Sequence, residues 1–287
     1  MLIRFGVLLL WLAHFLPARL IGAIGGALGT IVYTLGRTRT TDTNLAACFP
    51  DLSERERKRL ARRHYRALGR SVLELGILWW SSAQRIEKLV RMEGQEHFAV
   101  RDVRPVILLA PHLVGVDTGS ARLAMQYEAA AIYTRQKNPL LDKLMLKGRT
   151  RFGRVRMIAR QEGLRPAVKA LKQRLPLYIL PDMDFREKGS IFVPFFGVAA
   201  ATVPVVSRLA KMTGACVVPV VTRQLPGRGY VVRFYPAWEN FPTEDIQADT
   251  ERMNAFIEER VREMPEQYFW VHKRFRTRPP GENTKFY

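Results

Sequence analysis

Cysteine is scarce in this sequence, with only Cys48 and Cys216 among 287 residues. The two lie far apart and in unlike local sequence, so neither zinc-ligand spacing nor a disulfide framework is present. This usage is typical of proteins in a reducing compartment. We therefore expect no metal site, no cofactor and no disulfide-stapled fold.

Acidic residues are also few, because 26 Asp and Glu stand against 46 Lys and Arg, for a net charge of +20. A field of this sign favours an anionic partner, which is nucleic acid, an anionic membrane surface or an acidic substrate. A generic basic surface is the alternative. Internal repeats and low-complexity segments are absent. The length and the 47% hydrophobic content suit one large α/β domain or two small ones.

Charge is nearly absent from residues 5–36, where Arg19 is the one charged side chain. Pro17 divides this apolar run. Undivided, the run is long enough to cross the hydrocarbon core of a bilayer, whereas either piece alone is too short. A signal peptide is the alternative, but the run is too long and lacks a clean cleavage site. We interpret it as a retained hydrophobic membrane-anchor helix.

The domain boundary follows from this interpretation. We expect an anchor over residues 1–36 and one folded domain over residues 37–287. Arg37 and Arg39 come directly after the anchor, and a strongly basic body follows. The positive-inside rule places that body in the cytoplasm.

A long amphipathic helix is predicted after residue 52. Ser53 and Glu56, three residues apart, form a capping box at its start. Apolar side chains then recur at helical spacing, at Leu60, Leu68, Val72, Leu75 and Trp79. The other face is basic and carries Arg57, Lys58, Arg62, Arg63, Arg66 and Arg70. Such a helix either lies at an anionic bilayer surface or packs on the core with solvated arginines.

From about residue 94, strand-like and helix-like segments alternate. "PVILLA" and "PLYIL" are short apolar runs typical of strands covered on both faces. "SIFVPFF" and "ACVVPVVT" are also strand-like, and "QLPGRGYVVRFYPAW" predicts a turn feeding an edge strand. Helices are expected over residues 118–127, 163–174, 203–213 and 244–263. The pattern predicts an α/β fold with a mixed, mostly parallel sheet flanked by helices.

One stretch combines a buried strand with titratable groups. "VILLAPHLVGVD" ends a strand just before His112 and places Asp117 five residues later. Sites of open α/β sheets form at the carboxyl ends of strands. A carboxylate that accepts one ring N–H fixes the histidine tautomer, which leaves the other nitrogen to take a proton from a hydroxyl. The alternative makes Asp117 a helix cap and His112 a structural residue.

The identity of that hydroxyl follows from a second absence. Neither Ser nor Cys sits in a nucleophile elbow, so the hydroxyl must belong to the substrate and transfer must be direct. The general-base pair then predicts an enzyme that acts on an alcohol. Other histidines lack a comparable partner nearby and are expected to be structural or on the surface, namely His14, His64, His97 and His272.

Two further places add to this candidate site. Residues 135–160 hold nine basic side chains against one acid, which suits phosphates or carboxylates on a substrate, and Arg135 and Arg149 are taken as candidates. Asp182 follows the strand-like "LYILP" and is expected to converge on the same sheet edge as His112. A simple turn cap is the alternative for Asp182.

Several motifs resemble those of one enzyme family. "PHLVGVD", "YTRQKNPLLDKLMLKGRTR", "YILPDMDFREKGSIFVPFFG", "PEQYFWVHKRFRTRPPG" and "NLAACFPDLSERER" are similar, in order, to motifs of the late acyltransferases of lipid A biosynthesis. These are the lauroyl and myristoyl transferases of Gram-negative inner membranes. The resemblance covers essentially the whole chain. It implies a glycerolipid-acyltransferase-like fold and an acyltransferase domain over residues 37–287.

The resemblance also implies roles and partners. It gives His112 as the general base, Asp117 as its acidic partner (often Glu in that family), and Arg149 and Asp182 as substrate-binding residues. The implied donor is an acyl chain on acyl carrier protein, and the acceptor is a hydroxyl of an anionic, Kdo-bearing lipid A precursor. Inner-membrane lipids are the other implied partner, with the active domain on the cytoplasmic face. Acyltransferases of phospholipid synthesis instead carry "PEG" after the basic block, where this chain has "VPFFG".

Two alternatives stay open at this point. One is an acyltransferase of the same superfamily that acts on another membrane glycolipid. The other is a basic nucleic-acid-binding protein, although no nucleic-acid motif is present. That protein would bind nucleic acid in a strongly salt-dependent way and would not need its first 36 residues.

Overall fold

A seven-stranded sheet forms the centre of the computed structural model, which describes residues 2–36, 38–186, 189–227, 229–282 and 284–287. The strand order is β1-β9-β8-β2-β5-β3-β4. The strands are β1 (Val90–Glu93), β2 (Val106–Leu109), β3 (Ala129–Tyr133), β4 (Val155–Ala159), β5 (Leu177–Ile179), β8 (Cys216–Leu225) and β9 (Gly229–Phe234). Only β8 and β9 pair in antiparallel fashion within this described sheet. The predicted mixed, mostly parallel sheet is therefore confirmed.

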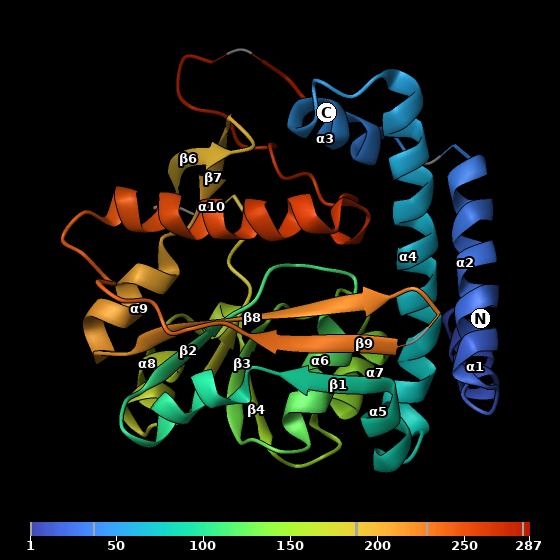
Figure 1. Ribbon diagram of the computed structural model, residues 1–287, viewed down its shortest axis with the longest axis horizontal. Helices are drawn as coiled ribbons and strands as arrows, with labels where there is room; N and C mark the ends of the chain where they lie inside the picture. The colour runs from blue at the N-terminus through green and yellow to red at the C-terminus, as the bar shows by residue number, and fades with distance from the viewer. Residues whose placement is uncertain (1, 37, 187–188, 228, 283) are drawn as a thin grey trace.

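Helices cover both faces of this sheet (Figure 1). The α-helices are α1 (Leu2–Ala13), α2 (Ala18–Thr34), α3 (Arg39–Cys48), α4 (Glu54–Trp80), α5 (Ala83–Leu89), α6 (Val116–Ala124), α7 (Pro139–Thr150), α8 (Arg165–Lys172), α9 (Val205–Thr213) and α10 (Ile246–Glu263). Short 3-10 helices are η1 (Gln95–Asp102), η2 (Arg160–Glu162) and η3 (Pro265–Gln267). A separate hairpin of β6 (Ile191–Phe195) and β7 (Val198–Thr202) lies above α10. The four helices expected after residue 94 correspond to α6, α8, α9 and α10.

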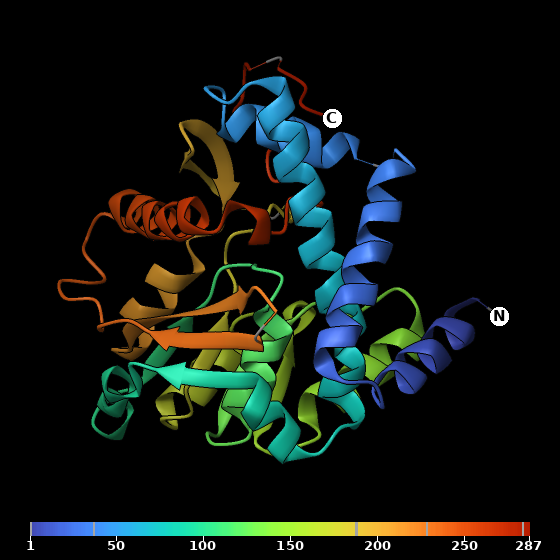
Figure 2. The same cartoon turned by 45° about the vertical axis from the view of Figure 1, so that its right-hand side comes forward.

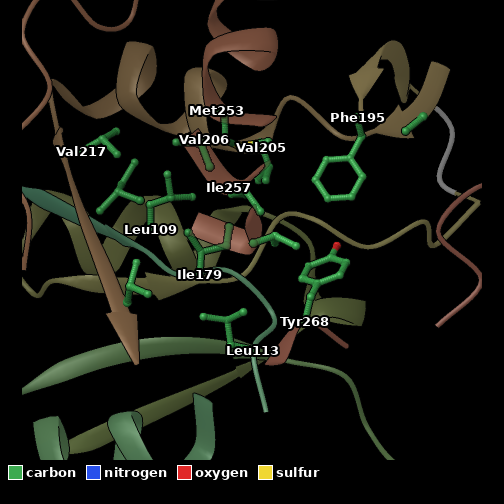
Figure 3. Packing of buried hydrophobic residues seen from close by; sticks show 14 of the residues in the cluster. Leu109, Leu113, Ile179, Phe195, Val205, Val206, Val217, Met253, Ile257 and Tyr268 are labelled. Atoms are coloured by element: carbon green, nitrogen blue, oxygen red, sulfur yellow. The ribbon is translucent and has the colours of Figure 1, made fainter. Parts of the chain in front are cut away.

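The central strand β2 shows why its sequence is a continuous apolar run. Ile107 and Leu109 point into the cluster formed with α8, α9 and α10, whereas Val106 and Leu108 point into the cluster formed with α4, α5 and α6. Successive side chains of a strand face opposite sides, so a strand covered on both faces needs apolar residues at every position. Figure 3 shows Leu109 on the first side, beneath side chains of α9 and α10.

One strand prediction needs correction. The segment after residue 224 was expected at the edge of the sheet, but β9 is covered by β1, which pairs with it in parallel from Val90 to Glu93. The sequence of β1 is only "VRME", which is too short and too charged to give a strand signal by periodicity. The edge position therefore belongs to β1.

The apolar N-terminus forms two helices, not the single helix expected. The break falls at Pro17, which has no N–H to donate and cannot continue the helix before it. Among the described residues, no single helix is both long and apolar enough to cross a bilayer; α2 and α3 together meet the length and composition requirement, with a 91° bend between them. Arg37, expected to follow the anchor, lies outside the described residues.

Helix α4 begins as the sequence predicts. The Ser53 hydroxyl accepts from the Glu56 backbone N–H, and the Glu56 carboxylate accepts from the Ser53 backbone N–H, so the capping box is present. The helix then packs on the body through buried residues such as Leu60 and Ile77. Of the predicted basic face, Lys58, Arg62, Arg63 and Arg66 are exposed, whereas Arg57 and Arg70 are partly buried. Figure 2 shows α2 running beside α4 along much of its length.

Candidate active site

Strand register brings His112 and Asp182 together. In the neighbouring parallel strands β2 and β5, Leu109 pairs with Ile179. His112 and Asp182 each follow that paired position by three residues, and each comes directly after a proline. Since proline has no N–H for the ladder, both strands end at the same level and release their next residue at the same edge. The expected convergence of Asp182 on this edge is confirmed.

The Asp182 carboxylate binds His112 twice. The Nδ1 atom of His112 lies 2.6 Å from Oδ1, and the backbone N–H of His112 donates to Oδ2 at 3.0 Å. The Asp182 side chain is fully buried, whereas 21% of the His112 side chain is exposed. An ionised carboxylate only accepts, so Nδ1 carries the proton and Nε2 is left as the basic nitrogen.

The electrostatics favour the ionised carboxylate. Burial by itself would raise the pKa of Asp182, but the charge of His112, its two hydrogen bonds and the positive charge of Arg274 together hold that pKa below its usual range. Asp182 is therefore ionised near pH 7 and places a negative charge behind the imidazole. A fixed anion at this position stabilises the imidazolium that forms when Nε2 takes a proton.

Asp117 binds a different cation. Nε and Nη2 of Arg149 lie 2.9 Å and 2.8 Å from its Oδ1 atom. The predicted pairing of His112 with Asp117 is therefore wrong, because Asp182 holds the position on His112. The alternative of a helix cap is also wrong, since α6 has Gly115 at its N-cap and Asp117 lies inside the first turn. There its charge is favourable toward the helix dipole.

The Asp117–Arg149 pair joins α6 to α7. Both side chains are partly exposed, at 30% for Asp117 and 27% for Arg149. Burial raises the pKa of the Tyr178 hydroxyl in β5; the charge of Asp117 also raises that pKa, whereas the charge of Arg149 lowers it. The candidate site therefore contains two pairs. In the first, the buried Asp182 holds His112; in the second, the partly exposed Asp117 holds the Arg149 guanidinium.

Arg135 lies farther out. Its guanidinium is 3.9 Å from the Glu162 carboxylate, with about half of each side chain exposed. An exposed pair of this length holds its partners only loosely. Substrate binding by Arg135 stays a prediction.

The C-terminal segment clamps the histidine loop, which the sequence did not reveal. The Phe269 N–H donates to the His112 carbonyl at 3.0 Å, and the Val114 N–H donates to the Gln267 carbonyl at 2.8 Å. The Tyr268 hydroxyl donates to the carbonyl of Asp182 at 3.2 Å. The tail therefore fixes the backbone of both members of the buried pair. Figure 3 shows Tyr268 directly beside Leu113.

Two further tail residues, Arg274 and His272, also belong to this region. Arg274 is buried and donates to the Ala201 carbonyl and the Thr202 hydroxyl, each at 2.8 Å. His272 Nε2 accepts from the Asp184 N–H at 3.2 Å. Burial, followed by the charges of His112 and Arg274, lowers the pKa of His272 to about 4. His272 is thus neutral near pH 7 and adds no second positive charge beside His112.

His64, expected to be structural or on the surface, is buried next to this clamp. Its Nδ1 lies 3.0 Å from the carbonyl of Glu266, next to the residues that hold the histidine loop. Burial lowers its pKa to about 4. His64 therefore supports the tail in its neutral form.

Comparison with known proteins identifies the family of this chain. The family model described as bacterial lipid A biosynthesis acyltransferase matches residues 1–277. The Escherichia coli K12 lipid A biosynthesis lauroyltransferase is 34% identical over 98% of this chain and 93% of its own length. The palmitoleoyltransferase of the same organism is 32% identical over 98% and 93%, and its myristoyltransferase is 31% identical over 93% and 84%. This chain belongs to the bacterial lipid A biosynthesis acyltransferase family.

Proposed function

We propose that this enzyme transfers a fatty acyl chain from acyl carrier protein to a hydroxyl of a Kdo-bearing lipid A precursor, without a covalent enzyme intermediate. The observation that carries the proposal is the buried Asp182 carboxylate on Nδ1 of His112. It leaves Nε2 as a base at the carboxyl edge of parallel strands, within a member of the lipid A acyltransferase family. The carrier protein and the Kdo-bearing acceptor follow from the sequence resemblance.

The steps balance as a simple acyl transfer. His112 Nε2 takes the proton of the acceptor hydroxyl while that oxygen attacks the thioester carbonyl carbon. The tetrahedral intermediate carries its negative charge on the former carbonyl oxygen and collapses by breaking the C–S bond. The imidazolium then returns its proton to the leaving thiolate. Asp182 stays ionised throughout and stabilises the imidazolium.

Arg149 supplies positive charge to this reaction. A planar guanidinium suits either a substrate phosphate or the developing oxyanion. Asp117 binds two of its three nitrogens, so Asp117 acts as a positioning residue that sets the direction of the guanidinium. In this proposal the family's acidic position serves the arginine, and the buried Asp182 serves the histidine.

We also propose that the enzyme works at the cytoplasmic face of the bacterial inner membrane, with residues 1–36 as its attachment. Large apolar side chains of α1 and α2 are exposed, for example Phe5, Leu28 and Ile31. An apolar surface of this size marks a contact with membrane or protein. After carbonate washing, the full-length protein should stay in the membrane pellet, and release into the supernatant would contradict the attachment.

The direct test of function is a transfer assay with defined substrates. Acyl–acyl carrier protein is incubated with a Kdo-bearing precursor that has a free hydroxyl on its acyl chains, and with one that lacks that hydroxyl. We expect mass spectrometry to find one added acyl chain only on the hydroxylated acceptor, and none with His112→Ala. Acylation of a different membrane glycolipid in place of both would support the alternative acceptor class.

A further inference from the structure

Gln267 attaches the histidine loop to the central sheet. Its backbone carbonyl accepts from the Val114 N–H at 2.8 Å, close to His112 in the chain. Its side-chain amide binds the backbone of Gln224 in β8: the Gln224 N–H donates to Oε1 at 2.7 Å, and Nε2 donates to the Gln224 carbonyl at 2.8 Å. Both glutamine side chains are buried. Gln267 therefore holds the loop with its backbone and the sheet with its side chain.

The position of Gln224 explains why an amide is needed there. Strand β2 ends at Leu109, which pairs with Pro219, whereas β8 continues to Leu225. An amide side chain offers one donor and one acceptor to a strand, as a peptide unit does. The Gln267 side chain thus pairs with β8 beyond the point where β2 ends.

A buried polar chain holds Gln224 in turn. Its side-chain N–H groups donate to the Tyr230 hydroxyl at 2.9 Å and to the Ala67 carbonyl of α4 at 3.4 Å. The Tyr230 hydroxyl donates to the Glu74 carboxylate of α4, and Arg70 Nε donates to the same carboxylate at 3.0 Å. Figure 1 shows α4 beside this end of β8 and β9. We call Glu74, Tyr230, Gln224 and Gln267 the polar chain.

The histidine loop also packs directly on the polar chain. A Cβ added to Gly115 would lie 3.1 Å from Cδ1 and Cε1 of the Tyr230 ring, and 3.1 Å from the Thr222 methyl group. Contacts this close leave the loop little room to move toward β9. The loop is therefore fixed through the Gln267 carbonyl and through the Tyr230 ring.

The polar chain acts as one unit for a physical reason. Its four side chains are buried, and hydrogen bonds in an environment of low dielectric constant strengthen one another. Removal of one member leaves the neighbouring donor or acceptor buried and unpaired, which is costly, so the remaining members rearrange. Asp182 fixes the His112 ring and N–H from one side, and the polar chain fixes the following backbone from the other.

We propose that Gln267 is a positioning residue for acyl transfer, held in place by Glu74, Tyr230 and Gln224, and that it keeps the His112 loop where Nε2 can reach the acceptor hydroxyl. This inference rests on the proposed function and adds residues that act through the backbone of the loop.

The first test is Gln267→Met, which keeps the length of the side chain and removes its donor and acceptor. A small displacement of a catalytic group is costly, so we expect kcat to fall by on the order of tenfold or more. The KM for each substrate should stay within about twofold, because a group that affects only the chemical step leaves substrate binding unchanged. A kcat equal to that of the wild type would overturn the inference.

Asn254→Leu is the matched control. Asn254 is also a buried amide, and it donates to the Pro194 carbonyl of the β6–β7 hairpin at 3.0 Å. Its loss should lower the melting temperature and leave kcat unchanged when both variants are assayed well below their melting temperatures. Equal losses of kcat in the two variants would show a general effect of stability and would contradict a positioning role.

The second readout reports on His112 without turnover. Its Nδ1–H lies in a short hydrogen bond of 2.6 Å to a buried carboxylate, so its proton resonance is expected at low field. The signal is assigned by its absence in His112→Ala. We expect it to shift or broaden in Gln267→Met and to stay in place in Asn254→Leu. An unchanged resonance together with a lowered kcat would contradict the inference, because the ring would then not have moved.

Tyr230→Phe tests the chain behind Gln267, because it removes only a hydroxyl. We expect a several-fold loss of kcat, and the double variant with Gln267→Met should lose little beyond Gln267→Met alone, since coupled sites are not additive. Losses that multiply would overturn the polar chain as one unit. If Gln267→Met does not fold, Tyr230→Phe carries the test, and unchanged kcat and resonance would then overturn the inference.

These results separate the inference from the proposed function. If the wild-type protein transfers no acyl chain to the hydroxylated precursor, the function fails, and the Nδ1 resonance still tests how Gln267 positions His112. If transfer occurs and Gln267→Met matches the wild type in kcat, the positioning role fails and the function stands.

Discussion

Asp182→Asn tests the reaction most directly, because Asp182 holds both Nδ1 and the backbone N–H of His112. Asparagine keeps one acceptor oxygen and replaces the other with an NH2 group. If the oxygen stays on the backbone N–H, the NH2 faces Nδ1 and forces the histidine proton onto Nε2. That tautomer cannot take a proton from the acceptor hydroxyl.

The expected loss of kcat follows from what the negative charge of Asp182 does: it fixes the tautomer of His112 and stabilises the imidazolium. A positioned general base contributes roughly 10²- to 10⁴-fold, and the same substitution behind a catalytic histidine elsewhere costs about 10⁴-fold. We therefore expect the kcat of Asp182→Asn to fall by on the order of 10³-fold or more, about 4 kcal/mol of transition-state stabilisation. The double variant with His112→Ala should lose little beyond the single one, because the pair acts as a unit.

Two comparisons make this result interpretable. Asp249→Asn is a matched control, since Asp249 is also a buried carboxylate, with hydrogen bonds to Ser207 and Thr243 and not to His112. Asp117→Asn keeps an acceptor for Arg149 and loses only the ion pair, so we expect a loss of about tenfold or less. Melting temperatures measured on each variant separate loss of folding from loss of chemistry.

The assay is single-turnover transfer from acyl–acyl carrier protein to the Kdo-bearing precursor. A positioned general base contributes on the order of 10²-fold or more to kcat. If Asp117→Asn lost that much kcat while Asp182→Asn kept near-normal kcat, the assignment of Asp182 as the partner of His112 would be refuted. Asp117 would then be the partner of His112 during the reaction.

Three further outcomes are expected. Arg149→Lys keeps the charge but loses the planar fork, so kcat/KM for the phosphorylated acceptor should fall by about tenfold or more, whereas Arg154→Lys on the exposed surface should not change it. The pKa of His64 is about 4 in the folded protein, against 6.5 for an unperturbed histidine. The unfolded chain therefore binds the proton first as the pH falls, and the free energy of unfolding drops by up to about 3 kcal/mol between these two pH values. Melting temperatures measured against pH should fall less steeply for His64→Asn. Gly29→Ala should lower the free energy of unfolding by about 1–3 kcal/mol, because the added Cβ would lie 1.9 Å from the Tyr65 carbonyl oxygen of α4. Gly26→Ala should be neutral or slightly stabilising, because its added Cβ has no neighbour closer than 3.9 Å. Equal melting temperatures for the two variants would contradict the close packing of α2 on α4.

The sequence by itself determined much of the framework. Short continuous apolar runs predicted buried strands, and the alternation with helical segments predicted a mostly parallel sheet. The residues Ser53 and Glu56 predicted where α4 begins. His112 and Asp182 each follow a strand-like apolar run, and both polar side chains were expected at one sheet edge. These features are local, because spacing, capping and strand termination each depend on a few neighbouring residues.

The pairing of charges was decided only by the tertiary structure. His112 and Asp117 are five residues apart, but the partner of His112 comes from a strand 70 residues later, because Leu109 lies opposite Ile179. Register between strands depends on packing over the whole sheet, which local periodicity does not encode.

The same holds for contacts between distant segments. The tail reaches back to the His112 loop through backbone hydrogen bonds, which any residue except proline can make, so no side-chain pattern announces them. The glycines of α2 showed their purpose only when Gly29 was found against the backbone of α4. The sequence supplied a base, two carboxylates and an arginine; the fold decided which carboxylate serves which cation, because only three-dimensional packing sets the distances between them.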